Sequence, residues 1–335
     1  MKKRVLFGFI FIVILFFGFI HAKEVSVCGD GTLLNSCSLT KGYFCDGETG
    51  KLIEKASICD CPENLVKSED KCISEYQTKP KEVVLKYFFD GEERELDFTV
   101  YEGMKDYVSE LDKTLFYSDG EQPSRGDFKL KSMDEEEQRE LLLPLVVAIQ
   151  NLEKKKEDQF RIATSIVQSI PYVYSGKTTS FFGIELNYSR YPYEVLYENQ
   201  GICGEKSQLL AFLLRELGYS TSLFYYGPEN HEAVGVKCPK YISAGRTGFC
   251  FIETTARSIV NDQSLVYVGG ITLESEPEIF PLSEGISLPR RTKEYRDART
   301  IEKLRNSRFV LLREWRLNRL NERYGLEGIG EYNLE

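Results

Sequence analysis

The nine cysteines of this 335-residue chain are unevenly distributed, and that distribution limits how its first part can fold. Six of them lie between Cys28 and Cys72, in a stretch rich in Gly, Asp, Asn and Ser that has little apolar periodicity. Such a stretch cannot build a hydrophobic core, so we expect three disulfides to stabilise a small cysteine-rich module at residues 23–75. Six cysteines allow fifteen pairings, among which the sequence does not choose, and a metal site is the alternative although the module contains no histidine.

Disulfides persist outside the reducing cytoplasm, and the first residues of the chain indicate export. Basic residues 2–4 precede an unbroken apolar run at 5–20, which ends near the small residue Ala22. This order is typical of a secretory signal, and the run is shorter than the ~20 residues of a comfortable membrane span. We predict that residues 1–22 are a signal peptide or a signal anchor. The protein is then extracellular or at the cell surface, and it contacts a membrane only through this segment if the segment is not cleaved.

The composition indicates a folded protein that does not bind nucleic acid. Hydrophobic residues make up 42% of the chain, which contains 20 Tyr and 21 Phe, so its apolar surface can offset the entropy of ordering it. The formal net charge of −9 argues against a nucleic-acid partner, because phosphate binding normally requires a basic domain. One histidine lies beyond the export segment, so we expect no metal and no cofactor.

The segment after the cysteine-rich module, residues 76–130, is predicted to be β-rich. Strand-like stretches at 83–89 and 95–101 flank the dipeptide Asp90-Gly91. That dipeptide is a strong signal for a tight hairpin turn. We therefore expect a β-hairpin in this segment.

The largest predicted domain spans residues 131–289 and begins with two helices. Apolar residues at helical spacing predict them at 134–150 and 158–170, and Pro144 should kink or break the first. The last segment, 290–335, is predicted to be a basic helix. Its interspersed acidic residues favour a solvated face and packing against the core over contact with anionic lipid or an acidic partner.

Cys203 stands apart from the other cysteines. Cys238 and Cys250 flank a glycine-rich turn and can close a fourth disulfide, which leaves Cys203 as an intermolecular bridge, a buried inert thiol or a reactive one. Leucines recur at helical spacing after it and Gly218 follows as a stop signal, so Cys203 is predicted in the first turn of a helix. There the unpaired backbone N–H groups and the helix dipole favour a thiolate, and the same groups can stabilise an oxyanion.

His231 is the candidate base for this thiol, since His21 belongs to the export segment. It opens a strand-like run that follows another at 221–226, and a third strand at 249–254 contains Glu253. Faces alternate along a strand, so one face can hold His231 and Glu253 while the other holds the disulfide. Directly opposed cysteines would displace Glu253 from His231 by several residues, unless a bulge intervenes or the bridge lies in the loop.

The sequence Gly-Ile-Cys-Gly-Glu-Lys-Ser at 201–207, with the leucines that follow it up to Tyr219, resembles the nucleophile helix of the transglutaminase-like superfamily. The similarity covers roughly residues 160–260. It implies an α+β fold with a papain-like core, in which the nucleophile helix packs on an antiparallel sheet. By the roles known in that family, Cys203 attacks an amide or acyl carbonyl, His231 takes its proton and later protonates the leaving group, and Glu253 orients the imidazole.

The resemblance has two departures and leaves one role open. His231 is followed by Glu232-Ala233 where many members have a small residue and then an aromatic one, and Glu253 stands where Asp is usual. Asp262 is the fallback for the orienting carboxylate. Family members also use a side-chain oxyanion donor before the cysteine, for which the candidates are Gln168, Tyr193 and Gln200.

The function implied by the resemblance is acyl transfer on protein or peptide amide bonds outside the cytoplasm. The covalent intermediate is a thioester, which water resolves in a peptidase or amidase and an amine resolves in a cross-linking enzyme. We favour hydrolysis, because water needs no second substrate site. The alternative is a catalytically inactive domain that acts as an extracellular protein-binding module, although the intact Cys203 and His231 argue against lost activity.

Overall fold

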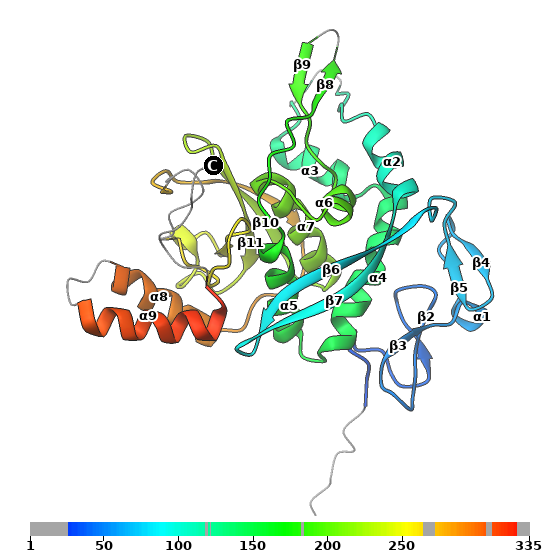
Figure 1. Cartoon of the computed structure of the whole chain (residues 1–335), viewed down its shortest axis with the longest axis horizontal. Coiled ribbons are helices and arrows are strands. Elements are labelled where there is room, and N and C mark those ends of the chain that lie inside the picture. The colour runs from blue at the N-terminus through cyan, green and yellow to red at the C-terminus, as the bar shows by residue number, and fades with distance from the viewer. Residues whose placement is uncertain are drawn as a thin grey trace, which may run out of the picture.

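The computed structural model describes residues 26–117, 120, 122–181, 184–263, 272–305 and 310–326. Within these ranges helices and strands are mixed in an α+β arrangement, as the sequence predicts (Figure 1). The predicted signal segment at 1–22 lies outside them. None of the helices described is long and apolar enough to cross a lipid bilayer.

The cysteine-rich module is built from short elements held by disulfides. Its elements are the strands β1 (Ser36–Cys37), β2 (Tyr43–Cys45) and β3 (Leu52–Glu54), the helix α1 (Ala56–Cys59) and the hairpin β4 (Val66–Ser68) and β5 (Lys71–Ile73). The cysteines pair as Cys28–Cys45, Cys37–Cys59 and Cys61–Cys72. All six are therefore in disulfides, and none is left for a metal. Together with a fourth disulfide described below, these bridges indicate an extracellular or secreted protein.

The module is attached to the helix α4 (Glu136–Leu152). The side chain of Asn151 bonds both the N–H and the carbonyl of Leu52, at 2.8 and 2.9 Å. Leu52 also packs in a buried cluster with Val147 and the Cys28–Cys45 bridge. The disulfides thus hold together a module whose small apolar cluster is completed by α4.

The predicted hairpin is present as β6 (Pro80–Phe89) and β7 (Glu92–Tyr101). Asp90 and Gly91 connect the strands with φ values of 55° and 85°, the positive values that this tight turn requires. The rest of the segment 76–130 is not β-rich, since it contains the helices α2 (Glu102–Glu110) and α3 (Arg125–Met133). Ser124 and Asp127 form a capping box that starts α3, so a local helix signal overrides the β prediction there.

The main hydrophobic core lies between α4, α5 (Lys156–Ser169) and α7 (Cys203–Glu216). The four leucines of α7 that predicted a helix are completely buried: Leu209, Leu210, Leu213 and Leu214. Pro144 lies within α4 without ending it. The hairpin β6–β7 packs along α5, on the side of the core away from the sheet (Figure 1).

A four-stranded antiparallel sheet packs against α7 in the strand order β12-β11-β10-β13. The strands are β10 (Thr221–Tyr226), β11 (His231–Lys237), β12 (Phe249–Ile252) and β13 (Glu278–Ser283). The first three form the predicted meander, and β13 adds an unpredicted edge strand beside β10. A separate hairpin, β8 (Thr178–Phe181) and β9 (Ile184–Asn187), projects from the body near α6 (Pro192–Glu198) (Figure 1).

The C-terminal segment forms two helices, α8 (Lys293–Arg305) and α9 (Val310–Tyr324), which corrects the prediction of a single helix at 290–335. The pair packs against the body, as predicted, through the buried cluster of Ile259, Ala298, Ile301, Leu304 and Leu320.

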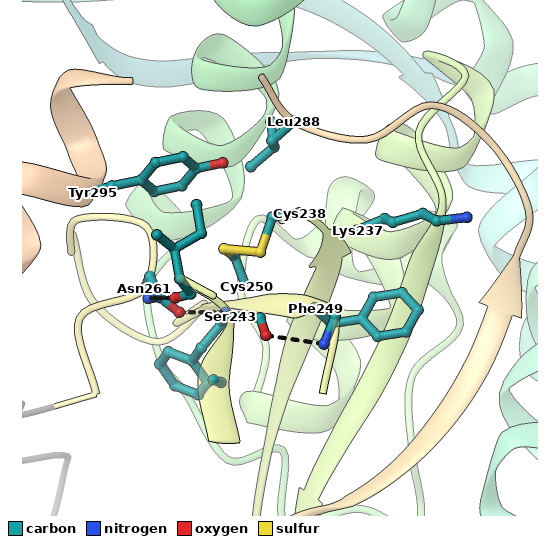
Figure 2. Close-up of a disulfide and its surroundings, with 12 residues drawn as sticks. Lys237, Cys238, Ser243, Phe249, Cys250, Asn261, Leu288 and Tyr295 are labelled. Carbon is teal, nitrogen blue, oxygen red and sulfur yellow. Dashed lines mark hydrogen bonds between the residues drawn. A yellow bond between two sulfur atoms is a disulfide. The ribbon is translucent and has the colours of Figure 1, made fainter. Parts of the chain in front are cut away.

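The fourth disulfide joins Cys238 to Cys250 where β11 ends and β12 begins (Figure 2). Leu288, from the segment before α8, and Tyr295, in the first turn of α8, lie over the bridge. Both cysteines are buried in the main core. The bridge therefore fastens the edge of the sheet to the core.

The strand register explains how this bridge and the pair His231 and Glu253 coexist. Val236 is the residue opposite Cys250, so Cys238 lies two residues beyond the directly opposed position and the bridge is diagonal. The same register places Glu253 on the face of His231 and close to it. The conflict expected from directly opposed cysteines does not arise.

Removing the fourth disulfide in the double variant Cys238→Ala, Cys250→Ala is expected to lower the free energy of unfolding by about 3 kcal/mol, because the bridge closes a loop with a sequence separation of 12. Urea unfolding under non-reducing conditions measures the change. The matched control is Cys61→Ala, Cys72→Ala, whose separation is 11 but which lies in the module, away from the sheet. An unchanged unfolding midpoint in the first variant would contradict the prediction.

Candidate active site

Cys203 is the first residue of α7, and it is the one cysteine of the nine, all in described ranges, that forms no disulfide. Its side chain is partly exposed. Two contacts fix the start of the helix: Gly201 pairs with Tyr172 in a parallel bridge, and Glu205 Oε2 accepts the N–H of Ile202 at 3.0 Å. The first N–H groups of a helix have no carbonyl within it to bond, so this end of α7 favours negative charge on the sulfur.

His231 is the first residue of β11, and only 7% of its surface is exposed. Its Nε2 lies 2.9 Å from Oε2 of Glu253. The imidazole also hydrogen-bonds to Cys203. The structure thus brings together all three residues that the resemblance assigns to catalysis.

The charge state of the imidazole follows from these neighbours. Burial opposes its protonation, but the hydrogen bonds to Cys203 and Glu253 and their negative charge outweigh burial and raise the pKa of His231 to about 10. At neutral pH the imidazole therefore holds a proton. An imidazolium beside a cysteine sulfur favours the thiolate, which is the reactive form.

Glu253 lies one residue beyond β12, whereas the sequence placed it inside a strand at 249–254. It is completely buried, and its Oε1 accepts the N–H groups of Thr254 and Thr255 at 3.0 and 2.7 Å as well as the hydroxyl of Thr255. Burial alone would raise the pKa of Glu253, but the hydrogen bond and charge of His231 and the bonds from Thr255 lower it. The strand ends here because the next N–H groups, those of Thr254 and Thr255, bond the carboxylate of Glu253.

The helix and the sheet are pinned to each other beside the thiol. Ser207, one turn after Cys203, donates to the carbonyl of Glu232 at 3.3 Å and shares a 3.0 Å hydrogen bond with Thr254. The hydroxyl of Thr254 also reaches the carbonyl of Cys203 at 3.4 Å. These contacts fix the position of the nucleophile relative to the base and the carboxylate.

Gly204 lets α7 approach the sheet this closely. A Cβ atom at this position would lie 2.4 Å from Oε2 of Glu232 and 3.1 Å from Nζ of Lys129. A larger residue would therefore displace the Glu232 carboxylate, which Arg125 and Lys129 hold beside the helix start.

A buried ionic cluster holds the segment before the nucleophile helix. Arg190 is 1% exposed and bonds Glu205 at 2.9 Å and Glu198 at 2.7 Å. Lys206, also buried, donates to the carbonyls of Gln168 and Ile170 at the end of α5. These charges are paired or hydrogen-bonded, as buried charges must be, and they fix α5, α6 and α7 together around the thiol.

The other sequence candidates lie elsewhere. The Asp262 carboxylate accepts from Nη1 of Arg305 at 2.7 and 2.9 Å, so this fallback is not the residue that orients His231. Gln168 donates to the carbonyl of Glu253 at 2.8 Å and so fixes the backbone of the residue whose side chain contacts His231. The hydroxyl of Tyr193 accepts the N–H of Tyr101 in the core.

Gln200, the third candidate for an oxyanion donor, directs its amide to Glu198 at 3.1 Å. Each of the three candidates is therefore engaged away from Cys203. The spacing of residues in the sequence does not indicate another oxyanion donor, because the place for such a donor is formed where two separate segments of the chain pair.

Tyr172 is the residue that sequence reasoning missed. It follows Pro171, which ends the preceding helical region, and it pairs with Gly201 two residues before the nucleophile. Burial raises the pKa of Tyr172, and the negative charge of Cys203 raises it further. The hydroxyl therefore stays protonated at neutral pH, in a segment that pairs with the chain just before Cys203.

The fold and the site define an α+β protein in which a thiol, an imidazole and a carboxylate are connected in series where a helix start meets a sheet. Across the ranges that the structure describes, no group of three His, Cys, Asp or Glu side chains is placed to hold a metal ion. The sequence matches no protein-family model and no curated protein.

Proposed function

We propose that this protein is a thiol acyl-transfer enzyme of the transglutaminase-like kind, with a papain-like core, that acts on protein or peptide amide bonds. The observation that carries the proposal is the hydrogen-bonded series from Cys203 through His231 to Glu253. A thiol paired with a protonated imidazole, which a buried carboxylate orients, is an activated nucleophile. An inactive binding module would have no use for this arrangement.

The reaction proceeds in two steps. The sulfur of Cys203 attacks the amide carbonyl, the C–N bond breaks, and the imidazolium of His231 gives its proton to the departing amine. Water then attacks the thioester while His231 takes a proton from it, so that a carboxylic acid leaves and the thiol is restored. Hydrolysis is preferred to cross-linking because water needs no second substrate site, whereas an amine acceptor does.

A trapping experiment tests the proposal. The full chain is mixed with casein peptides and quenched in acid, and mass spectrometry locates any acyl adduct. We expect a thioester at Cys203, carboxylate products in water, and no adduct in Cys203→Ser under the same quench. A second incubation with a fluorescent primary amine distinguishes the acceptors, since amine incorporation would favour cross-linking. Failure to acylate, together with alkylation of Cys203 that does not depend on His231, would reject the enzyme assignment.

Tyr172 is proposed to donate its hydroxyl hydrogen to the developing oxyanion. The variant Tyr172→Phe is expected to lower the rate of acylation by about 100-fold, the usual effect of removing one oxyanion donor. Alkylation of Cys203 by iodoacetamide should be unchanged, because that displacement forms no oxyanion. Stopped-flow kinetics with a peptide ester measure the rate of acylation, and mass spectrometry measures the rate of alkylation.

The matched control is Tyr174→Phe, two residues along the same segment. The Tyr174 hydroxyl donates to Asn187 at 2.9 Å, and its side chain is also exposed. Acylation in this variant should remain within about twofold of the unmodified protein. A purely structural role for Tyr172 would instead slow acylation and alkylation together.

A further inference from the structure

A cavity of about 560 Å³ lies beside the start of α7, and its charged lining is basic. The cationic residues that line it are Lys113, Arg125, Lys129, Lys131 and Arg190. No acidic residue is among the lining residues in the described part of the chain. In a protein with a formal net charge of −9, this is a local reversal of sign.

Two of these cations bond carbonyl oxygens. Lys131 donates to the carbonyls of Asp112 and Thr114, and Lys113 donates to the carbonyl of Ser189. The Lys113 ammonium also lies 3.6 Å from the ring centroid of Tyr188. Carbonyls and rings orient an ammonium without cancelling its charge, so both lysines keep charge available to an anion.

The remaining cations are only partly neutralised. Arg125 and Lys129 share one carboxylate, that of Glu232, at 2.6 and 2.8 Å. Arg190, in contrast, is paired with two carboxylates, Glu198 and Glu205. Burial lowers the pKa of Lys113 to about 8, and a nearby anion would offset that loss. Glu194 and Glu205 also act on Lys113, but none of these carboxylates lines the cavity, so the surface that a ligand meets is cationic.

The cavity adjoins the start of α7, the helix that carries Cys203. Nζ of Lys129 donates to the carbonyl of Gly204, the residue after Cys203, at 3.1 Å. Gln208, on the next turn of α7, lines the cavity and donates to the carbonyl of Lys129 at 3.0 Å. The cavity therefore borders the first two turns of the helix that carries the thiol, although Cys203 itself is not among the lining residues.

The cavity also has an apolar surface and a size suited to a small part of a peptide. Phe128, 46% exposed, and Tyr191 line it together with the cations. Binding sites for small ligands typically have volumes of about 300–1,000 Å³ and combine apolar walls with a few polar anchors. A carboxylate on a short hydrocarbon stem fits both the charge and the walls.

We propose that this cavity binds a carboxylate of the peptide substrate whose amide bond Cys203 attacks, which makes acidic peptides the substrate class. The inference rests on the proposed function for the role of the thiol, but the binding itself does not. The carboxylate comes from a Glu or Asp side chain or from a free C-terminus. Both supply the same chemistry, and matched peptides distinguish them.

The test measures binding to the full chain carrying Cys203→Ala, by calorimetry at pH 7 and low salt. Three acetylated peptides are compared: Ala-Ala-Glu-Ala-Ala amide, Ala-Ala-Gln-Ala-Ala amide, and Ala-Ala-Gln-Ala-Ala with a free C-terminus. Binding at least about tenfold tighter for the first than for the second assigns the cavity to an acidic side chain. The same preference for the third assigns it to a terminal carboxylate. Equal affinities for all three overturn the proposal.

Variants locate the binding. Lys131 is at an exposed position. Lys131→Met and Lys113→Met should each weaken binding of the carboxylate peptide by about tenfold, which removes most of its advantage over the neutral peptide. The matched control is Lys81→Met, since Lys81 donates to the Tyr197 carbonyl and lies 4.6 Å from the Tyr197 ring centroid, outside the cavity. A preference that survives both cavity variants would place the carboxylate elsewhere and overturn the proposal.

The two proposals can fail separately. If carboxylate binding is found while Cys203 in the unmodified chain forms no acyl adduct, the cavity stands and the enzyme assignment fails. If an adduct forms at Cys203 with the Glu and Gln peptides at equal rates and equal affinity, the enzyme assignment stands and the cavity proposal fails.

Discussion

The variant His231→Ala is expected to lose about 10⁴-fold in the rate of acyl transfer, the largest effect of any single substitution of a residue other than the nucleophile. In the proposed mechanism the imidazole supplies both the charge that stabilises the thiolate and the proton that the leaving amine needs. The one other histidine of the chain, His21, lies in the predicted signal segment, so we expect no second imidazole to replace His231. Turnover of a peptide amide or ester measures the loss.

Alkylation by iodoacetamide separates activation of the thiol from the later proton transfer. In the unmodified protein the imidazolium remains protonated up to about pH 10, so alkylation of Cys203 should stay fast at pH 6. In His231→Ala the rate at pH 6 should fall about 100-fold, because an unassisted thiol is less than 1% ionised there. At pH 9.5 both proteins should react at similar rates, which checks that the sulfur is still accessible. Equal rates at pH 6 would show that His231 does not activate the thiol.

The variant Glu253→Ala is expected to lower the free energy of unfolding by about 3–5 kcal/mol at pH 6. It leaves the buried imidazolium of His231 without its counter-charge and the N–H groups of Thr254 and Thr255 without an acceptor. Urea unfolding measures the change. Glu253→Gln retains an acceptor for the threonines and should cost less. Glu284→Ala, at a carboxylate whose side chain is 95% exposed, should change stability by less than about 0.5 kcal/mol.

The stabilisation from this pair depends on pH with a predictable sign. The pKa of His231 is raised from 6.5 to about 10, so its contribution is complete below pH 6.5 and is lost as pH rises through about 10. The pKa of Glu253 is lowered from 4.5, so its contribution is present above pH 4.5 and is lost as pH falls through the lower folded value. The stability difference between the unmodified protein and Glu253→Ala should therefore be largest between about pH 4.5 and 6.5. A difference that grows towards pH 10 would contradict the assigned charges.

Local sequence signals predicted the elements that carry the reactive groups. Leucines at helical spacing placed Cys203 at the start of α7, and Asp90-Gly91 placed the turn between β6 and β7. Both signals act between residues that are neighbours in the chain, where backbone geometry decides the outcome. The capping box of Ser124 and Asp127 is a signal of the same kind, which the prediction of a β-rich segment at 76–130 did not take into account.

The sequence predicted which residues form the candidate triad, but it did not predict how they are arranged in space. The odd number of cysteines and the single histidine of the exported part limited the choice to Cys203 and His231. Whether Glu253 or Asp262 met the imidazole depended on the register of β11 and β12, and on the point where β12 ends. A shift of one residue would have turned the carboxylate to the opposite face.

The sequence by itself predicted a cysteine-rich module held by disulfides, a helix that begins at the cysteine left over from four possible pairs, and His231 as the candidate base for its thiol. The tertiary structure alone decided the disulfide pairing, the selection of Glu253, the approach of Tyr172 to the thiol, and the basic cavity that joins Lys113 and Lys131 to α7. The physical reason is distance along the chain. The residues that meet are 11 to 75 positions apart, from Cys61–Cys72 to Lys129–Gly204, so they meet only when the core has closed the intervening loops, and no local preference encodes which of them will meet.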